Sequence, residues 1–116
     1  MLLIGYNRCS TCKKAKVWLT ENGFEFEERP IMSENPTEEE LRIWIEKSGQ
    51  SADKFFNKTG HYFSELNLKA ELPDMPEQEK IHILSLDGRL VRRPLLIDGD
   101  TVLVGFKVKE WEKALL

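Results

Sequence analysis

Residues 2–31 carry the patterns of a strand, a helix and a second strand in close succession. Leu2–Tyr6 form a short apolar run typical of a buried strand. Apolar side chains follow at helical spacing over residues 11–22, and Gly23 supplies the C-terminal cap. The stretch "FEFEERPI" then alternates apolar and charged residues until Pro30 limits strand pairing. Because a helix usually links parallel strands, we expect a right-handed β-α-β unit.

Residues 33–88 differ from this opening because helical patterns dominate them. Thr37 is a predicted N-cap, the acidic residues after it suit the start of a helix, and Gly49 is a predicted stop. With 116 residues, the chain is long enough for one core but short for two. We therefore expect a single domain over residues 1–116, with a helical insertion at about 33–88 whose apolar faces need the sheet to cover them.

The end of the chain carries a hairpin pattern and a last helix. In "RRPLLIDGDTVLVGF", two β-rich runs flank Asp98-Gly99-Asp100, which predicts a tight hairpin. The stretch "KVKEWEKALL" predicts a closing helix with one apolar side. The order β-α-β, helical insertion, β-β-α predicts an α/β fold in which helices flank a small mixed sheet.

Composition excludes several classes of function. The formal net charge of −3 gives the whole molecule no electrostatic reason to bind nucleic acid or an anionic membrane directly. No apolar run has the length of a signal-peptide core or a membrane span, which predicts a cytoplasmic protein. Permanent disulfides are rare in a reducing cytoplasm, so two cysteines at CxxC spacing indicate redox chemistry or half of a metal site.

The only two cysteines, Cys9 and Cys12, lie where the first predicted helix begins. Unpaired amides and the positive end of the helix dipole stabilise a thiolate at this position, and Arg8, Lys13 and Lys14 add positive charge. We therefore predict that Cys9 is the nucleophile and that Cys12 resolves a mixed disulfide or a sulfenic acid.

Two other interpretations of the cysteines stay open. Free cysteine is often buried as a small hydrophobic side chain, although Cys9 lies in the polar stretch "NRCS". Structural zinc needs four ligands, and only His61 and His82 could join the cysteines, unless a metal is shared between two chains. Each histidine lacks a partner nearby in the sequence, so we predict no bound metal and assign neither an acid-base role.

Arg92, Arg93 and Pro94 precede the predicted hairpin. A proline can begin a strand, and its peptide bond is either cis, which exposes backbone to a neighbouring loop, or trans. The arginines either hold an anion or a thiolate or are solvated at the surface.

Three stretches together resemble one family of the thioredoxin fold, which contains the glutathione/glutaredoxin-coupled arsenate reductases of the ArsC type and the Spx regulators. They are "YNRCSTCKKAKVWLTENGFEFEERPI", "FFNKTGHYFSELNL" and "RRPLLIDGDTVLVGF", in the family's order and approximate spacing. The resemblance implies a thioredoxin-like sheet with the active-site cysteine at Cys9, the helical insertion, and Arg93-Pro94 as a cis-proline corner that faces Cys9. Cys12 matches the second cysteine of the Spx-type redox switch.

The resemblance also implies two functions. One is a thiol-disulfide oxidoreductase, similar to arsenate reductases, in which Arg8, Lys13, Arg93 and Pro94 support the substrate or the thiolate. No cofactor is bound, and glutathione with glutaredoxin, or thioredoxin, supplies electrons. Of the three arginines that hold the oxyanion in such reductases, only Arg93 is matched, because the middle motif offers Asn57 and "VLVGF" has no arginine.

The other function is a redox-responsive regulator of the Spx type that binds the RNA polymerase alpha subunit. Gly49 matches the contact glycine of those regulators, whereas the chain ends at "EKALL" without their long polar tail.

Overall fold

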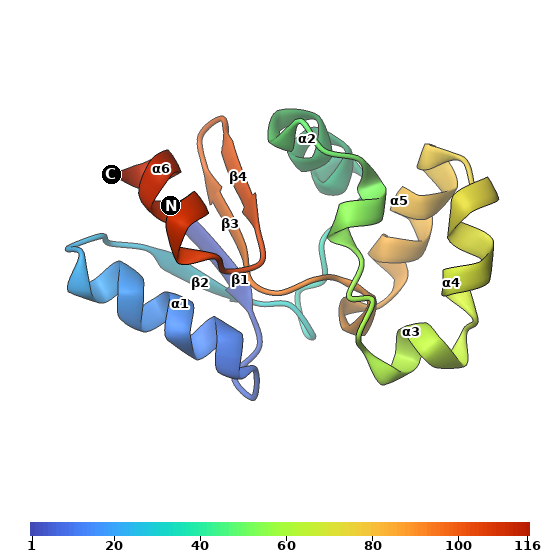
Figure 1. Cartoon of the computed structure of the whole chain (residues 1–116), viewed down its shortest axis with the longest axis horizontal. Helices are drawn as coiled ribbons and strands as arrows, with labels where there is room; N and C mark the ends of the chain where they lie inside the picture. Colours follow the sequence, from blue (N-terminus) through green and yellow to red (C-terminus); the bar gives the residue numbers. More distant parts are fainter.

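A four-stranded mixed sheet lies between two layers of helices in the computed structural model, which describes residues 1–116 (Figure 1). Helices α1 and α6 cover one face of the sheet, and α2 with the rest of the insertion covers the other. The molecule measures 41 × 27 × 24 Å along its principal axes. Short 3-10 helices carry the label η, and the elements in chain order are β1 Leu2–Gly5, α1 Ser10–Glu21, β2 Glu27–Pro30, α2 Glu38–Ser48, η1 Ala52–Phe55, α3 His61–Glu65, α4 Leu68–Glu71, η2 Leu72–Asp74, α5 Glu77–Leu86, η3 Gly88–Leu90, β3 Leu95–Asp98, β4 Thr101–Val104 and α6 Val108–Leu115.

The strand order is β2-β1-β3-β4. Strand β1 pairs in parallel with β2, as expected when a helix links two strands, and antiparallel with β3. Strands β3 and β4 form the predicted hairpin around Asp98-Gly99-Asp100, where Gly99 has a φ of 59°. The predicted α/β class and the mixed sheet flanked by helices are confirmed.

Strand β2 is shorter than predicted. The alternating stretch 24–31 predicts pairing from Phe24 onward, but pairing begins at Glu27. The paired part of β1 is only four residues long, so β2 has partners only from Glu27 to Pro30. Phe24 and Phe26 lie before the strand and pack against the cluster beneath α1 and α6.

Alternation along the central strands separates two hydrophobic clusters. Leu3 and Leu96 point to the face covered by α1 and α6, where the cluster also contains Ala15, Leu19 and Trp111. Ile4 and Leu95, each one position away, point to the opposite face. The sheet is therefore buried on both faces, which explains the continuous apolar runs of β1 and β3.

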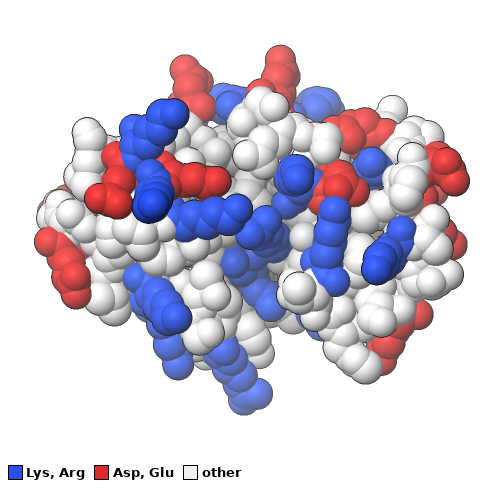
Figure 2. All heavy atoms as spheres, viewed as in Figure 1, with Lys and Arg blue, Asp and Glu red and all other residues white.

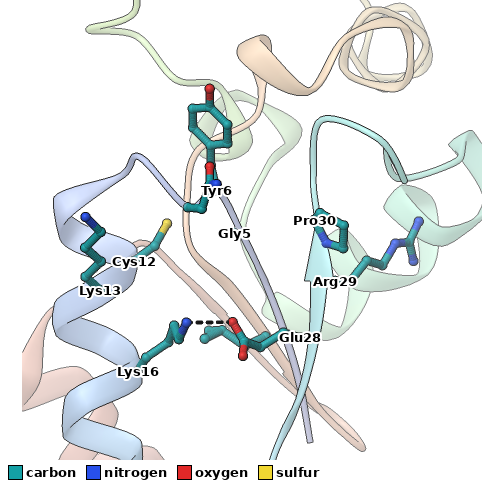
Figure 3. Close-up of a pocket in the computed structure, with 10 residues that line it drawn as sticks. Gly5, Tyr6, Cys12, Lys13, Lys16, Glu28, Arg29 and Pro30 are labelled. Carbon is teal, nitrogen blue, oxygen red and sulfur yellow. Dashed lines mark ion pairs between the residues drawn. The ribbon is translucent and has the colours of Figure 1, made fainter.

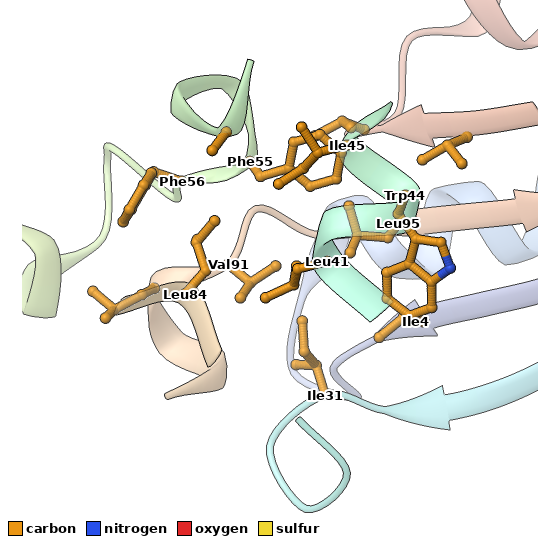
Figure 4. Packing of buried hydrophobic residues seen from close by; sticks show 14 of the residues in the cluster. Ile4, Ile31, Leu41, Trp44, Ile45, Phe55, Phe56, Leu84, Val91 and Leu95 are labelled. Carbon is orange, nitrogen blue, oxygen red and sulfur yellow. The ribbon is translucent and has the colours of Figure 1, made fainter. Parts of the chain in front are cut away.

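The insertion packs on the second face through one cluster of 17 buried residues. Figure 4 shows Leu41 and Ile45 of α2 near the middle of this cluster, with Ile4, Leu95 and Trp44 toward the sheet. Val91 lies beside Leu41, and Phe56 and Leu84 lie farthest from the strands. Sheet and insertion thus share a single hydrophobic core.

Local signals position the helices of the insertion. Thr37 caps α2 in a capping box: its hydroxyl accepts from the Glu40 N–H at 3.1 Å, and the Glu40 carboxylate accepts from the Thr37 N–H at 3.0 Å. Gly49 ends the helix in the left-handed conformation, as predicted. No helix in the structure has both the length and the apolar character that a membrane crossing needs.

Candidate redox site

Cys9 is the N-cap of α1, directly after the turn that follows β1. Its N–H donates to the Tyr6 carbonyl at 3.0 Å, which closes the turn. Its sulfur accepts a hydrogen bond from the Cys12 N–H at 3.3 Å, so the thiol takes the place that Ser or Asp occupies at other helix starts. An anionic sulfur is favoured there because the free amides and the helix dipole both attract negative charge.

The Cys9 side chain is half-buried and opens into a cavity of about 580 Å³. Four segments that are distant in the sequence form its walls: the start of α1 with its N-cap, residues 57–60, residues 92–93 at the approach to β3, and residues 105–107 after β4. The cationic side chains in the walls are Arg92, Arg93 and Lys107, and no acidic side chain lines the cavity. The surroundings of Cys9 are therefore positively charged.

Arg93 provides the charge that acts on Cys9. Its guanidinium carbon lies 5.5 Å from the centre of the Tyr6 ring, in cation–π contact. The Arg93-Pro94 peptide bond is cis, as the resemblance implies, and Pro94 is buried. The Pro94 carbonyl accepts from the Gly105 N–H at 2.8 Å, which joins the approach to β3 to the end of β4.

Arg92 is positioned by Gly105. A Cβ at Gly105 would lie 2.8 Å from the Arg92 Nε, so a side chain at this position would displace the guanidinium. Gly105 also has a φ of +74°, which glycine adopts readily. The Arg92 N–H donates to the Phe55 carbonyl at 2.8 Å. The Arg92 backbone is thereby tied to the insertion, and its guanidinium lies against Gly105.

Asn57 comes from the insertion and is brought to the site by backbone pairing. Its N–H donates to the Leu90 carbonyl at 2.8 Å, next to the isolated bridge between Phe56 and Val91. The Asn57 side-chain oxygen accepts from the Thr59 hydroxyl at 3.3 Å. The segment 57–60 therefore presents amide and hydroxyl groups to the cavity beside the two arginines.

The pKa of Cys9 is lowered from its ordinary value of 9.0. Burial alone would raise this pKa, but hydrogen bonds from the Cys12 thiol and the Cys12 N–H, together with the charge of Arg93, outweigh the effect of burial. Cys9 is thus the more acidic thiol of the pair and the one that is open to solvent.

Cys12 has the opposite environment. The residue is 3% exposed, and burial followed by the hydrogen bond to Cys9 raises the pKa of its thiol to about 12. Gly5 at the end of β1 makes room for it, because a Cβ there would lie 3.1 Å from the Cys12 Sγ. The structure places a protonated donor thiol directly beside an acidic one.

A second cavity, of about 340 Å³, lies between α1 and β2, and the Cys12 side chain forms part of its lining. Figure 3 shows the Cys12 side chain on α1 directed toward the backbone of Tyr6, while Lys16 forms an ion pair with Glu28 across the cavity at 2.8 Å. Cys9 does not line this cavity. The two sulfurs therefore face different cavities.

The sequence-predicted site residues divide into two groups. Cys9 and Arg93 line one cavity, and Cys12 is joined to Cys9 by a hydrogen bond. Pro94 is buried directly after Arg93 but lines neither cavity, Arg8 is exposed and lines neither, and Lys13 lies on the Cys12 side. Distant segments bring the other cavity residues to Cys9, and the sequence carries no local signal for Thr59, Gly60, Gly105, Phe106 and Lys107. Thr11 differs from these, because it accompanies Cys9 at the start of α1. Lys107 directly follows the "VLVGF" stretch that lacks an arginine.

Neither histidine lines the cavity at Cys9 or the cavity at Cys12. His61 pairs with Glu65 at 2.8 Å, and His82 contacts Glu38 at 3.1 Å. No group of three or more His, Cys, Asp or Glu side chains is arranged to hold a metal ion. The arrangement at Cys9 suits a nucleophilic thiolate and, through its cations, an anionic substrate.

The chain is similar to known proteins over most of its length. The sequence model of the ArsC family matches residues 4–114. The protein YusI of Bacillus subtilis is 47% identical over 93% of this chain and 92% of its own length. The global transcriptional regulator Spx of Enterococcus faecalis is 31% identical over 92% of this chain and 80% of its own length.

Solved structures of similar proteins share this fold. An ArsC family related protein from Bacteroides fragilis is 51% identical, with a TM-score of 0.94 over 97% of this chain and 94% of its own. A possible arsenate reductase from Streptococcus mutans is 30% identical, with a TM-score of 0.86 over 96% of both chains.

Proposed function

Because the chain belongs to the ArsC family, we propose that it is a thiol-disulfide oxidoreductase whose nucleophile is Cys9 and whose resolving thiol is Cys12. One observation carries the proposal: the two thiols of one CxxC motif have opposite environments. Cys9 is accessible with a lowered pKa, and Cys12 is buried with a raised pKa. Such asymmetry separates the attacking thiol from the resolving one.

In the proposed reaction, the Cys9 thiolate attacks one sulfur of a substrate disulfide. A Cys9–substrate disulfide forms as the substrate S–S bond breaks, and the leaving thiolate takes a proton from solvent. Cys12 then loses its proton and attacks the Cys9 sulfur, which forms the Cys9–Cys12 disulfide and releases the second substrate thiol after protonation. The substrate gains two electrons and the cysteine pair loses two.

The local charges favour this order of steps. The hydrogen bond to Cys9 and the charge on Cys9 both help to raise the pKa of Cys12. A mixed disulfide at Cys9 carries no negative charge, so both effects disappear and Cys12 ionises more easily at the moment it must attack. A cellular thiol donor, either glutathione with glutaredoxin or thioredoxin, returns the two electrons to the pair.

An oxyanion such as arsenate is a second substrate for this site. Its support is the meeting of Arg92 and Lys107 with Arg93 in the Cys9 cavity, because guanidinium and ammonium groups hold oxyanions through charge-assisted hydrogen bonds. Arsenate reduction would use the same cysteine pair and donor.

Trapping of the mixed disulfide tests the proposal. Cys12→Ser with 2-hydroxyethyl disulfide should form a stable adduct at Cys9, detected by intact mass, whereas the wild type should pass on to the Cys9–Cys12 disulfide. Cys9→Ser should form neither species. Turnover of disulfides and of arsenate is then measured with each thiol donor. A Cys9 that alkylates no faster than a free thiol and turns over neither substrate contradicts the proposal.

Similarity to the regulator Spx supports a second function, redox-dependent binding of the RNA polymerase alpha subunit. The candidate contact is Gly49, which is exposed at the end of α2, where a Cβ would have no neighbouring atom within 4 Å. A pull-down with the C-terminal domain of the alpha subunit, in reducing and oxidising buffer, tests this function. Gly49→Arg should abolish binding. Gly23→Arg is the matched control, because Gly23 is also exposed and has a similar φ of +77°.

A further inference from the structure

The Cys9 cavity continues into the helical insertion. A neighbouring cavity of about 330 Å³ shares Asn57, Thr59 and Arg92 with it. A further cavity, of about 630 Å³, shares Asp53 and Lys58 with this neighbouring cavity. We call these three adjoining hollows the basic groove, which runs from Cys9 over the segment 53–60 to the surface between Lys69 and Lys80.

The charge of the basic groove is opposite to that of the whole chain. Seven of the 17 Lys and Arg residues line it, but only one of the 20 Asp and Glu residues does. The one acid, Asp53, is paired with Lys58. Figure 2 shows Lys and Arg side chains gathered across the middle of one face, with most Asp and Glu side chains nearer its edges. The cations that line the groove are Lys54, Lys58, Lys69, Lys80, Arg92, Arg93 and Lys107.

Few of these cations are neutralised within the molecule. Lys58 pairs with Asp53, and Lys107 lies 3.9 Å from Glu110. Lys54, Lys69, Lys80 and both arginines form no ion pair. A line of unpaired cations attracts a polyanion and raises its rate of association.

The floor of the groove is partly apolar. Phe63, Leu72 and Pro73 line the distal cavity, Phe56 the middle one and Phe106 the one at Cys9. Each cavity has the volume of a single small-molecule site, so the three together suit an extended chain with several side chains. A nucleic acid would match the charge, but it offers no sulfur to the thiolate at the end of the groove.

We propose that the substrate of Cys9 is an acidic polypeptide segment that carries a disulfide and docks along the basic groove. This inference rests on the proposed oxidoreductase function and names its substrate class. Acidic side chains lie over the lysines of the insertion, and the substrate disulfide lies at Cys9 beside Arg93. The chemistry is the exchange described above: Cys9 bonds to one substrate sulfur, the other leaves as a thiol, and Cys12 completes the two-electron transfer.

The test compares two synthetic peptides of equal length that differ only by Glu→Gln and carry one cysteine in a mixed disulfide with 2-mercaptoethanol. The rate of adduct formation at Cys9 is measured by intact mass on Cys12→Ser. The acidic peptide should react about tenfold faster at low ionic strength, and added salt should remove most of the difference. In Lys69→Gln/Lys80→Gln, the ratio of the two rates should fall at least about threefold.

The matched control is Arg42→Gln/Lys47→Gln, which removes the same charge from α2 outside the groove. It should keep the wild-type ratio. Equal rates for the two peptides, an unchanged ratio in the Lys69/Lys80 variant, or tighter binding of a single-stranded oligonucleotide than of the acidic peptide would each overturn the docking proposal. Failure of Cys9 to react even with 2-hydroxyethyl disulfide would instead overturn the oxidoreductase function.

Discussion

At the scale of single residues, the site depends on a contact between two thiols of unequal acidity. The Cys12 N–H donates to the Cys9 sulfur, and the neighbouring Cys12 thiol and the charge of Arg93 also lower the pKa of Cys9. Desolvation keeps Cys12 protonated and therefore available as the donor. The reactivity of Cys9 is thus a property of the pair and of one arginine that is 84 positions away in the sequence.

The first prediction concerns the thiol hydrogen bond. Cys12→Ala removes the donor that lowers the pKa of Cys9, so this pKa should rise and alkylation of Cys9 by iodoacetamide should slow at neutral pH. Cys12→Ser keeps an O–H donor and should shift the pKa less. The measurement is the alkylation rate against pH for the wild type and both variants. An unchanged midpoint in Cys12→Ala would show that the thiol hydrogen bond has no effect.

The second prediction concerns stability against pH. The pKa of Cys12 is about 12 in the folded chain and has its ordinary value of 9.0 in the unfolded chain. As pH rises, the unfolded state therefore loses this proton first. The contribution of the protonated Cys12 thiol to the free energy of unfolding is fully present below pH 9.0. It is lost as pH rises toward about 12, at about 1 kcal/mol per pH unit. Urea unfolding of the wild type and Cys12→Ala between pH 8 and 11 measures it. A difference in unfolding free energy that does not change with pH would contradict the burial effect.

At the scale of elements, short-range signals decide where α2 begins and ends. The Thr37 capping box satisfies the first free amides, the acids Glu38, Glu39 and Glu40 follow in the first turn, and Gly49 terminates the helix. Leu41, Trp44 and Ile45 then face the core at helical spacing. The helix that carries the candidate polymerase contact is therefore well specified by its own sequence.

The third prediction tests this cap. Thr37→Ala leaves the Glu40 N–H without its side-chain acceptor and should lower the free energy of unfolding by about 1 kcal/mol. Thr20→Ala is the control, since Thr20 is exposed within α1 and alanine suits a helix interior. Chemical denaturation of both variants provides the comparison. Equal stability of the two variants would mean that the capping box does not stabilise α2.

At the scale of the whole molecule, the insertion and the sheet share one hydrophobic cluster. Phe55 in the insertion is fully buried in the same cluster as Ile4 and Leu95 of the central strands. The backbone bonds from Arg92 to Phe55 and from Asn57 to Leu90 cross the same boundary. We propose on this basis that the chain unfolds as a single domain.

The fourth prediction tests whether the chain unfolds as a single domain. Phe55→Ala should lower the free energy of unfolding by about 3–5 kcal/mol and should increase hydrogen exchange in β1 and α5 alike. Leu86→Ala, at a side chain that is 65% exposed, should change stability by less than about 0.5 kcal/mol. Loss of exchange protection in the insertion alone, with β1 still protected, would show two separate units.

Interactions between residues close in the sequence control several features of this protein. The β-α-β order, the hairpin at Asp98-Gly99-Asp100 and the caps at Thr37 and Gly49 depend on residues a few positions apart, and the structure confirms them. The position of Cys9 at the start of α1 follows from the same local signals. The extent of β2 did not, because its length depends on the partner strand.

The surroundings of Cys9 depend on packing between segments that are distant in the sequence. Burial of the sheet on both faces brings Asn57, Arg92, Gly105 and Lys107 to one cavity from separate segments, and no spacing in the sequence encodes their proximity. The same packing turns Cys12 toward a different cavity and aligns the insertion lysines with the site. Their placement follows from which apolar faces cover the sheet, a property of the whole chain rather than of any one segment.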